Sequence, residues 1–531
     1  MLHFIANLKP YLARPGRGVR RFDGYLLSAD YRREHGRLLP VVRGGGRVLV
    51  ADNGNVDEIG ALIERFTAAA APLQARRKAA ERAHGRRARP GDLPPALAAD
   101  SRALAERVAA ASAAVADEAR ARAVLPVQVG MAPDYLVAME DFTITALAGL
   151  GLQPEYTGLS LDWYRPLSER AVAFARDTAA GAYGSCDGAL PFAGLHGIDY
   201  DTARQAGRLA GEAGVPGIAT GLAGALADRS FTDFRVQDGA SEPLAEAVPR
   251  PYLRALDVAA GLHTGYAEAT GRRPRFHALG AGSPILVPLL ALLGDAGTYT
   301  ALDSTAPILD AYSSQTVALY VREPAPLKLK AHRIAEYWLG GGPAWACPCP
   351  YCRGHERRHP HDLAAARAWW AGAGRRSLTP SDLRAPCPLA EFLPLLGAAA
   401  DPAARAAAGL ARIGHNHWVL RRLEAEAQRH ALAGSLRPWA EDVVESYLHG
   451  PGDAGWKAAT HAAWQVADAT AKRLADAAPG GELTARRGAH QPPPRASHSR
   501  PSRTRTRTVP SRSVRTSRGT PRNAASVAGA G

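Results

Sequence analysis

Six short apolar runs, each ended by polar or glycine residues, most constrain what this chain can fold into. They are RVLVADNGN (47–55), DYLVAMED (134–141), LPFAGLHG (190–197), GIATGLAG (217–224), RFHALGAG (275–282) and YTALDST (299–305). Helix-length segments follow most of them, for example DYDTARQAGRLAGEAG. Buried strands that alternate with helices predict parallel βα units, and their number favours an α/β fold closed as a TIM-type (β/α)8 barrel. A doubly wound open sheet is the alternative, but the first run lacks the dinucleotide-binding glycine pattern usual in such sheets.

The most polar residues of these segments stand where the apolar runs end. In a (β/α) barrel, the carboxyl ends of the strands and the loops after them form the active face. Taken singly, Asp303 could be a helix N-cap, and Asp52 could belong to a tight turn. Two carboxylates at one barrel mouth, however, can divide the nucleophile and acid/base roles of glycosidic chemistry. We therefore expect a catalytic face that includes Asp52, Glu140, Asp141, His196 and Asp303.

The cysteines indicate a metal site rather than a disulfide framework. Of five cysteines, three fall within the hexapeptide CPCPYC as Cys347, Cys349 and Cys352. Secreted frameworks spread their cysteines in pairs, whereas clustered thiolates can converge on one ion. A structural zinc takes four nitrogen or sulfur ligands, so a fourth must come from elsewhere. By residue type alone the candidates are His355, His359, His361 and His415, and the isolated Cys186 and Cys387 are interpreted as inert thiols.

Several motifs in one order resemble the tRNA-guanine transglycosylases. HALGAGSPILVPLLALLGDAGTYTALDST is similar to the family's histidine-led glycine motif, helix and nucleophile strand, and CPCPYC to its zinc triplet. IGHNHWVLRRLEAEA resembles its His-Asn zinc helix, and residues 190–224 resemble the strand–helix–strand unit of its base pocket. The resemblance covers about residues 45–60 and 130–430. It implies exchange of guanine in a nucleic acid for a 7-deazaguanine base through a covalent aspartyl intermediate.

The resemblance also implies residue roles. Asp303 corresponds to the nucleophile and Asp52 to the general acid/base. Either Glu140 or Asp141 would accept hydrogen bonds from guanine, because the resemblance does not distinguish between these two adjacent positions. The remaining base-pocket positions are His196, Gly197 and Gly221. The ligands of a structural Zn²⁺ would be Cys347, Cys349, Cys352 and His415.

The chain also departs from the family pattern. Asp52 is followed by Asn53-Gly54-Asn55 rather than Ser-Gly-Gly-Phe-Gln, and His196 stands where the family has glutamine. Cys352 and His415 are 63 residues apart, more than is usual in the family. These departures indicate a divergent member, for which relatives that insert 7-deazaguanines into DNA are an alternative to those acting on tRNA. The family often forms homodimers through its zinc region, so a second copy is a further candidate partner.

Charge and composition set the domain expectations. The net charge is +15, but the eleven arginines after Ala485 leave the body only +4, so the overall charge does not argue for nucleic-acid binding. We expect a disordered basic tail at 481–531, a helical segment at 441–480 and a barrel domain at 1–440. The barrel domain would contain a helical insertion at about 67–123 and a zinc-binding region at about 345–430. Without a membrane-length apolar run or a signal-like N-terminus, we expect a cytoplasmic protein that does not enter membranes.

Two other functions compete with base exchange. A non-catalytic family member could serve as a nucleic-acid-binding subunit, but it would not require both Asp52 and Asp303. A zinc hydrolase on a barrel would need histidine and carboxylate ligands with an open coordination position at the strand ends. Here the three thiols lie beyond the last apolar run.

Overall fold

The computed structural model describes residues 2–7, 24–43, 48–84, 93–152, 157–227, 230–312, 317–342, 347–384 and 388–476. The chain divides into two units, Met1–Pro479 and Gly480–Gly531, and every described residue belongs to the first. The expected disordered tail at 481–531 lies outside the described residues, as does Cys387.

Parallel strands form a closed barrel in the order β1-β10-β9-β6-β5-β4-β3-β2. Strand β1 pairs with both β10 and β2, which closes the ring. The α/β barrel expected from the sequence is therefore present. A strict strand–helix alternation is not shown, because residues 8–23 between β1 and β2 are not described. The strands are β1 (Leu2–Asn7), β2 (Gly24–Ser28), β3 (Val48–Asp52), β4 (Tyr135–Val137), β5 (Leu190–Gly194), β6 (Gly217–Gly221), β9 (Arg275–Leu279) and β10 (Thr300–Ser304).

Each of the six apolar runs contains one of these strands. Because every second side chain of a strand faces the same way, alternate residues of these strands fill the interior of the barrel. One core cluster consists of Leu26, Val50, Val137, Phe192, Ala219, Tyr299 and Ala301, contributed by six different strands or their edges. Side chains two positions apart in a strand face the same side. Asp52, two residues after Val50, and Asp303, two residues after Ala301, therefore point to the inside of the barrel at its carboxyl end.

Helices cover the outside of the barrel and form two larger cores with it. Helix α8 (Tyr200–Glu212), which follows β5, packs closely on α10 (Arg250–Thr270). Glycines make this approach possible, since a Cβ at Gly265 would lie 1.9 Å from the carbonyl oxygen of Arg204. A capping box of Asp199 and Thr202 begins α8 directly after the loop that carries His196. The other covering helices are α1 (His35–Arg43), α5 (Thr143–Gly149), α7 (Leu161–Ala179), α9 (Ala223–Ala227), α11 (Leu286–Ala291) and α12 (Ala306–Tyr312).

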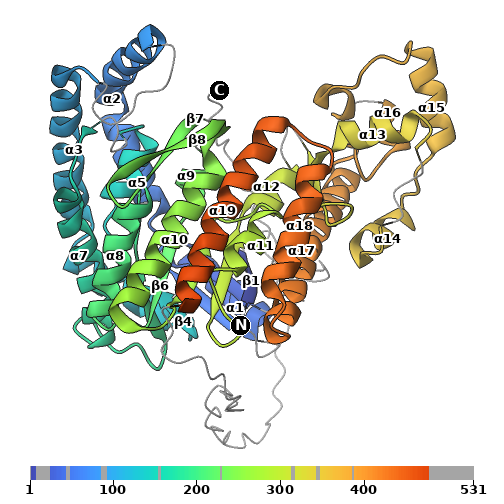
Figure 1. The fold of residues 1–531 in the computed structure, drawn as a ribbon. Helices are drawn as coiled ribbons and strands as arrows, with labels where there is room; N and C mark the ends of the chain where they lie inside the picture. Colours follow the sequence, from blue (N-terminus) through green and yellow to red (C-terminus); the bar gives the residue numbers. More distant parts are fainter. Residues whose placement is uncertain are drawn as a thin grey trace, which may run out of the picture. The chain divides into compact units, whose positions relative to one another are not determined.

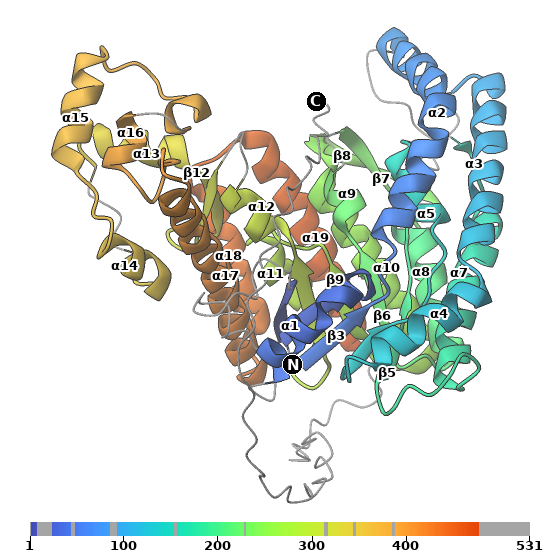
Figure 2. The same cartoon turned by 180° about the vertical axis from the view of Figure 1, so that it is seen from behind.

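The helical insertion after β3 extends beyond the expected bounds of about 67–123 at both ends. Helix α2 (Val56–His84) begins earlier, directly after Asn55, where Asp57 and Glu58 in its first turn favour a helix N-terminus. Helix α3 (Pro95–Val115) lies beside α2, as both views show (Figures 1 and 2). A third helix, α4 (Glu118–Val129), leads into β4.

Two antiparallel hairpins interrupt the helix–strand pattern. Strands β7 (Phe231–Gln237) and β8 (Ala240–Pro249) follow β6, and β11 (Ala318–Val321) and β12 (Leu327–Lys330) follow β10. After β12 a small separate core forms around Trp338 and Leu389. Its helices are α13 (Ala331–Leu339), α15 (Leu363–Gly372), a 3-10 turn (Pro380–Leu383) and α16 (Pro388–Phe392), whereas α14 (Pro350–Glu356) belongs to a separate small core with the cysteines.

Three C-terminal helices complete the described unit. Helix α17 (Pro402–Leu432) packs on α14, α12 and β1, so it joins the small core to the barrel. Helices α18 (Leu436–His449) and α19 (Ala454–Asp476) follow, and α10, α19, α18 and α17 lie side by side (Figure 1).

Candidate active site and metal centre

Asp52 and Asp303, the residues expected to share the chemistry, are brought together inside the barrel mouth. Asp52 ends β3 and Asp303 is the fourth residue of β10, so both stand at the carboxyl end of parallel strands. Burial, together with the charges of Glu140 and Asp303, raises the pKa of Asp52 from 3.8 to about 7. A carboxyl group with this pKa can both give and take a proton near neutrality.

Two groups face the Oδ1 atom of Asp303. The backbone N–H of Gly280, at the glycine turn after β9, donates to Oδ1 at 2.9 Å. The Nε2 atom of His277 on β9 lies 3.9 Å from the same oxygen. Asp303 is only 2% exposed, so its carboxylate is surrounded by protein groups that include these two.

Glu140 is the centre of a buried polar group in the barrel mouth. Its Oε2 lies 2.5 Å from His196 Nε2, and its Oε1 accepts hydrogen bonds from the side-chain amides of Asn53 (3.4 Å) and Asn55 (3.2 Å). Burial alone would raise the pKa of Glu140, but His196 and the two amides outweigh it and hold this pKa below its usual value. These partners keep the Glu140 carboxylate ionised and fix its orientation.

Asp141, the other acidic candidate, does not join this group. Its Oδ2 forms an ion pair with Arg170 at 2.8 Å, and its Oδ1 accepts the backbone N–H of Thr143 at the start of α5. The two neighbouring acids therefore have different surroundings: Glu140 faces the polar group of the barrel mouth, and Asp141 caps a helix.

The two glycines of the expected base pocket lie close to His196. A cavity lined by His196, Gly197 and Gly221 continues to apolar side chains of α5 and α10. A Cβ at Gly221 would lie 3.2 Å from Cε1 of His196. A Cβ at Gly197 would lie 2.6 Å from that of Ala203. Both positions are therefore kept small by direct contact.

The cysteine triplet and His415 form a second buried cluster, away from the acidic residues. The ligand atoms of Cys347, Cys349, Cys352 and His415 all lie within 4.8 Å of one another, which is compatible with a metal site. The three sulfur atoms lie 3.3, 3.5 and 3.5 Å from Nδ1 of His415. Hydrogen bonds from Cys347 and Cys352 hold the pKa of the Cys349 thiol below its usual value, while the same neighbours and burial raise the pKa of the Cys352 thiol.

The surroundings of His415 prepare it as a ligand. Its Nε2 donates to the backbone carbonyl of Tyr320 at 2.6 Å, which leaves the Nδ1 lone pair directed at the sulfurs. The neighbouring Asn416 bonds the backbone of Tyr320 and Pro307, and so ties α17 to the strand and helix that precede the triplet. Of the four histidines that the spacing left open, His415 alone belongs to the cluster found among the described residues.

Several residues of the site were not singled out from the sequence. Asn53 and Asn55 are parts of a sequence typical of a tight turn, yet both donate to Glu140. His277 and Tyr299 lie in the barrel interior beside Asp303. His277 leads the glycine motif of the resemblance but was given no role there, and the signal for Tyr299 was its two-residue spacing from other inward-facing positions.

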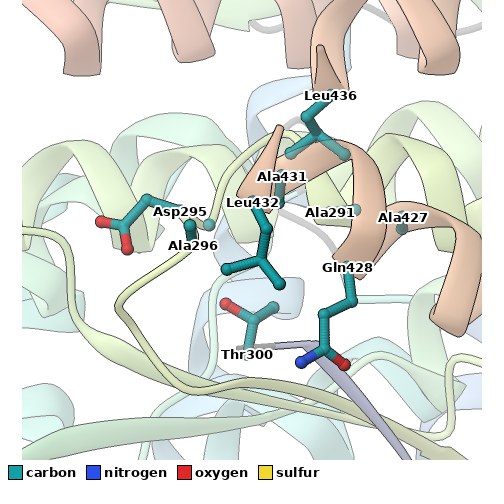
Figure 3. Close-up of a pocket in the computed structure, with 10 residues that line it drawn as sticks. Ala291, Asp295, Ala296, Thr300, Ala427, Gln428, Ala431, Leu432 and Leu436 are labelled. Carbon is teal, nitrogen blue, oxygen red and sulfur yellow. The ribbon is translucent and has the colours of Figure 1, made fainter. Parts of the chain in front are cut away.

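A further small pocket lies at the opposite end of β10. It is lined by Thr300, Gln428 and Leu432 with small neighbours, and Asp295 directs its carboxylate away from Leu432 and Gln428 (Figure 3). Asp295 instead accepts the backbone N–H groups of Gly297 and Thr298. The barrel mouth contains titratable groups that face one another, whereas Asp295 is the one acidic residue among those that line this pocket.

Models of known protein families were searched without a match, and no curated protein matches the chain either. Among the helices of the described residues, none has the length and hydropathy needed to cross a membrane.

Proposed function

We propose that this chain is a guanine transglycosylase that exchanges a guanine in a nucleic acid for a 7-deazaguanine. The observation that carries the proposal is the convergence of Asp52, Asp303 and Glu140 on one barrel mouth. We take the fold to be a TIM-type (β/α)8 barrel with insertions, whose catalytic residues stand at the strand ends. The target nucleotide would be turned out of its helix so that its glycosidic bond reaches the mouth.

Base exchange would proceed by two displacements at the anomeric carbon, C1′. In the first, a carboxylate oxygen of Asp303 bonds to C1′ while the C1′–N9 bond breaks, and its electron pair leaves with guanine. Protonated Asp52 supplies the proton that neutralises the departing base. In the second, N9 of the 7-deazaguanine attacks C1′, its proton passes to Asp52, and the Asp303 ester bond breaks. Two inversions retain the configuration at C1′.

Glu140 is suited to read the guanine edge that both bases share. A carboxylate has about four lone-pair positions, and His196, Asn53 and Asn55 use three of them. The remaining position can accept one N–H of a base, while the three donors prevent the carboxylate from rotating. Because incoming and outgoing bases present this edge alike, one pocket can serve both displacements.

The cysteine cluster fits a structural Zn²⁺. Zinc–sulfur bonds of about 2.3 Å and a zinc–nitrogen bond of about 2.0 Å at the tetrahedral angle place each sulfur about 3.5 Å from the nitrogen. The separations in the cluster are 3.3 to 3.5 Å. Four protein ligands leave no open coordination position, so the ion would brace α14 against α17 rather than take part in the reaction.

The test is an exchange assay on the full chain with labelled guanine or 7-cyano-7-deazaguanine, offered tRNA and duplex DNA separately. We expect label to enter one polymer and a covalent polymer–protein adduct to be trapped. Asp303→Asn should abolish both while zinc stays bound. Asp310→Asn is the matched control, because Asp310 binds Tyr320 and Lys328 outside the barrel mouth. No incorporation into either polymer, or adduct formation by Asp303→Asn, would overturn the proposal.

A further inference from the structure

His277 occupies a fixed place in the barrel between an aromatic floor and Asp303. The register of β9 and β10 pairs His277 with Ala301. Residues two positions before and after Ala301 face the same side of β10, so Tyr299 lies below His277 and Asp303 above it. Tyr299 packs against Tyr135 and Phe192, which fill the barrel beneath. His277 has no exposed surface, so its only neighbours are protein groups.

Hydrogen bonding selects one tautomer of this imidazole. The hydroxyl of Tyr299 lies 3.4 Å from His277 Nδ1. Burial, together with Tyr135 and Asp303, raises the pKa of Tyr299 well above its usual value, so the phenol keeps its proton and can donate it to Nδ1. The other nitrogen, Nε2, then carries the imidazole hydrogen. It is buried, has no hydrogen-bond partner among the described residues and points at Asp303 Oδ1 from 3.9 Å.

We propose that Tyr299 and His277 form a chain of donors that positions the Asp303 carboxylate for attack on C1′. This inference rests on the proposed function. The Gly280 N–H and the His277 Nε2–H would both hold Oδ1, so that Oδ2 becomes the attacking oxygen. The 3.9 Å separation shortens to a hydrogen bond when substrate fills the mouth, as catalytic contacts commonly do. His277 keeps its proton throughout, so it acts as a positioning residue.

The donor chain has a consequence for the pH dependence of the reaction. A donor to the carboxylate form of Asp303 offsets the like charges nearby, and its loss should move the acid limb of the rate profile to higher pH. The other titratable groups near this chain come from several elements. They are Asp52 on β3, Glu140 after β4, Tyr135 on β4, Asp134 before β4 and Glu424 on α17.

The test compares adduct formation across pH for three variants of the full chain. His277→Leu should lower kcat about 10- to 100-fold, leave KM for the base nearly unchanged and shift the acid limb to higher pH. His277→Gln keeps an N–H donor and should restore much of the rate and profile. His263→Leu is the matched control, because His263 is another fully buried histidine that packs on Phe276 away from Asp303. Zinc content and melting temperature report on folding.

A substrate-free measurement separates this inference from the proposed function. In nitrogen NMR of histidine-labelled protein, the His277 signal, assigned with His277→Gln, should show a proton on Nε2 and respond to Asp303→Asn. If the native chain exchanges no base, the proposed function fails, whatever this signal shows. If the native chain is active but His277→Leu keeps its rate and pH profile, or if Nδ1 carries the proton, the positioning role is wrong.

Discussion

Asp52→Asn should stabilise the protein, and the gain should grow as the pH rises. The pKa of Asp52 is raised from 3.8 to about 7 by burial and by the charges of Glu140 and Asp303. Between these values the folded state binds a proton that the unfolded state has released, so stability falls as pH increases. The full shift corresponds to about 4 kcal/mol of destabilisation above pH 7, and about half of it develops between pH 5.5 and 8.5. An uncharged asparagine of similar size avoids this cost.

The assay is a series of melting curves for the native chain and the variant from pH 5.5 to 8.5 at constant zinc. A change of 1 kcal/mol shifts the melting temperature by about 1–2 °C for a unit of this size. The advantage of Asp52→Asn should therefore increase by about 2–4 °C across the range. The difference between the two proteins cancels the pH dependence of groups that do not interact with Asp52. Asp162→Asn, a change at an exposed acid of α7, should show no such trend.

A constant difference between the native chain and Asp52→Asn, or an advantage that shrinks as the pH rises, would refute this reasoning. Either result would mean that protein donors hold Asp52 ionised, as they hold Glu140. Asp52 could then accept a proton near neutrality but could not supply one. The first displacement would have to find its acid elsewhere.

Three further predictions concern the cysteine–histidine cluster, the adjacent acids Glu140 and Asp141, and the basic tail. His415→Ala should lose bound metal by elemental analysis, whereas His417→Ala, on the same helix but outside the cluster, should retain it; equal metal content would implicate another ligand. Glu140→Gln should raise KM for the base about tenfold with little change in melting temperature. Asp141→Asn, which breaks the ion pair with Arg170 but keeps an acceptor for the Thr143 N–H, should lower stability by about 1–3 kcal/mol in denaturation and leave KM unchanged. Deleting the residues after Gly480 should weaken nucleic-acid binding and flatten its salt dependence, since phosphate contacts release counterions; unchanged titrations would show that the arginines have no part in binding.

Much of the barrel was accessible from the sequence because buried parallel strands are continuous apolar runs. All six runs contain barrel strands, and of the acidic residues at their ends Asp52, Glu140 and Asp303 face the mouth, whereas Asp141 does not. Strands β1 and β2 were missed. Each is short, and the glycine- and arginine-rich residues 14–21 between them obscure the alternation of strands and helices on which the prediction of the barrel depended. The start of α2 was missed for a different reason: ADNGN is typical of a turn, and its asparagines are held by Glu140, which is distant in the sequence.

The sequence by itself determined the local elements and the metal-binding triplet, since both depend on residues close together along the chain. Only the tertiary structure decided which of two adjacent acids faces the barrel mouth, and it placed His415, which the resemblance had named, beside the three cysteines. It also decided that His277 lies between Tyr299 and Asp303. These choices depend on strand register, helix packing and burial. Such quantities join residues tens to hundreds of positions apart, and no local pattern encodes them.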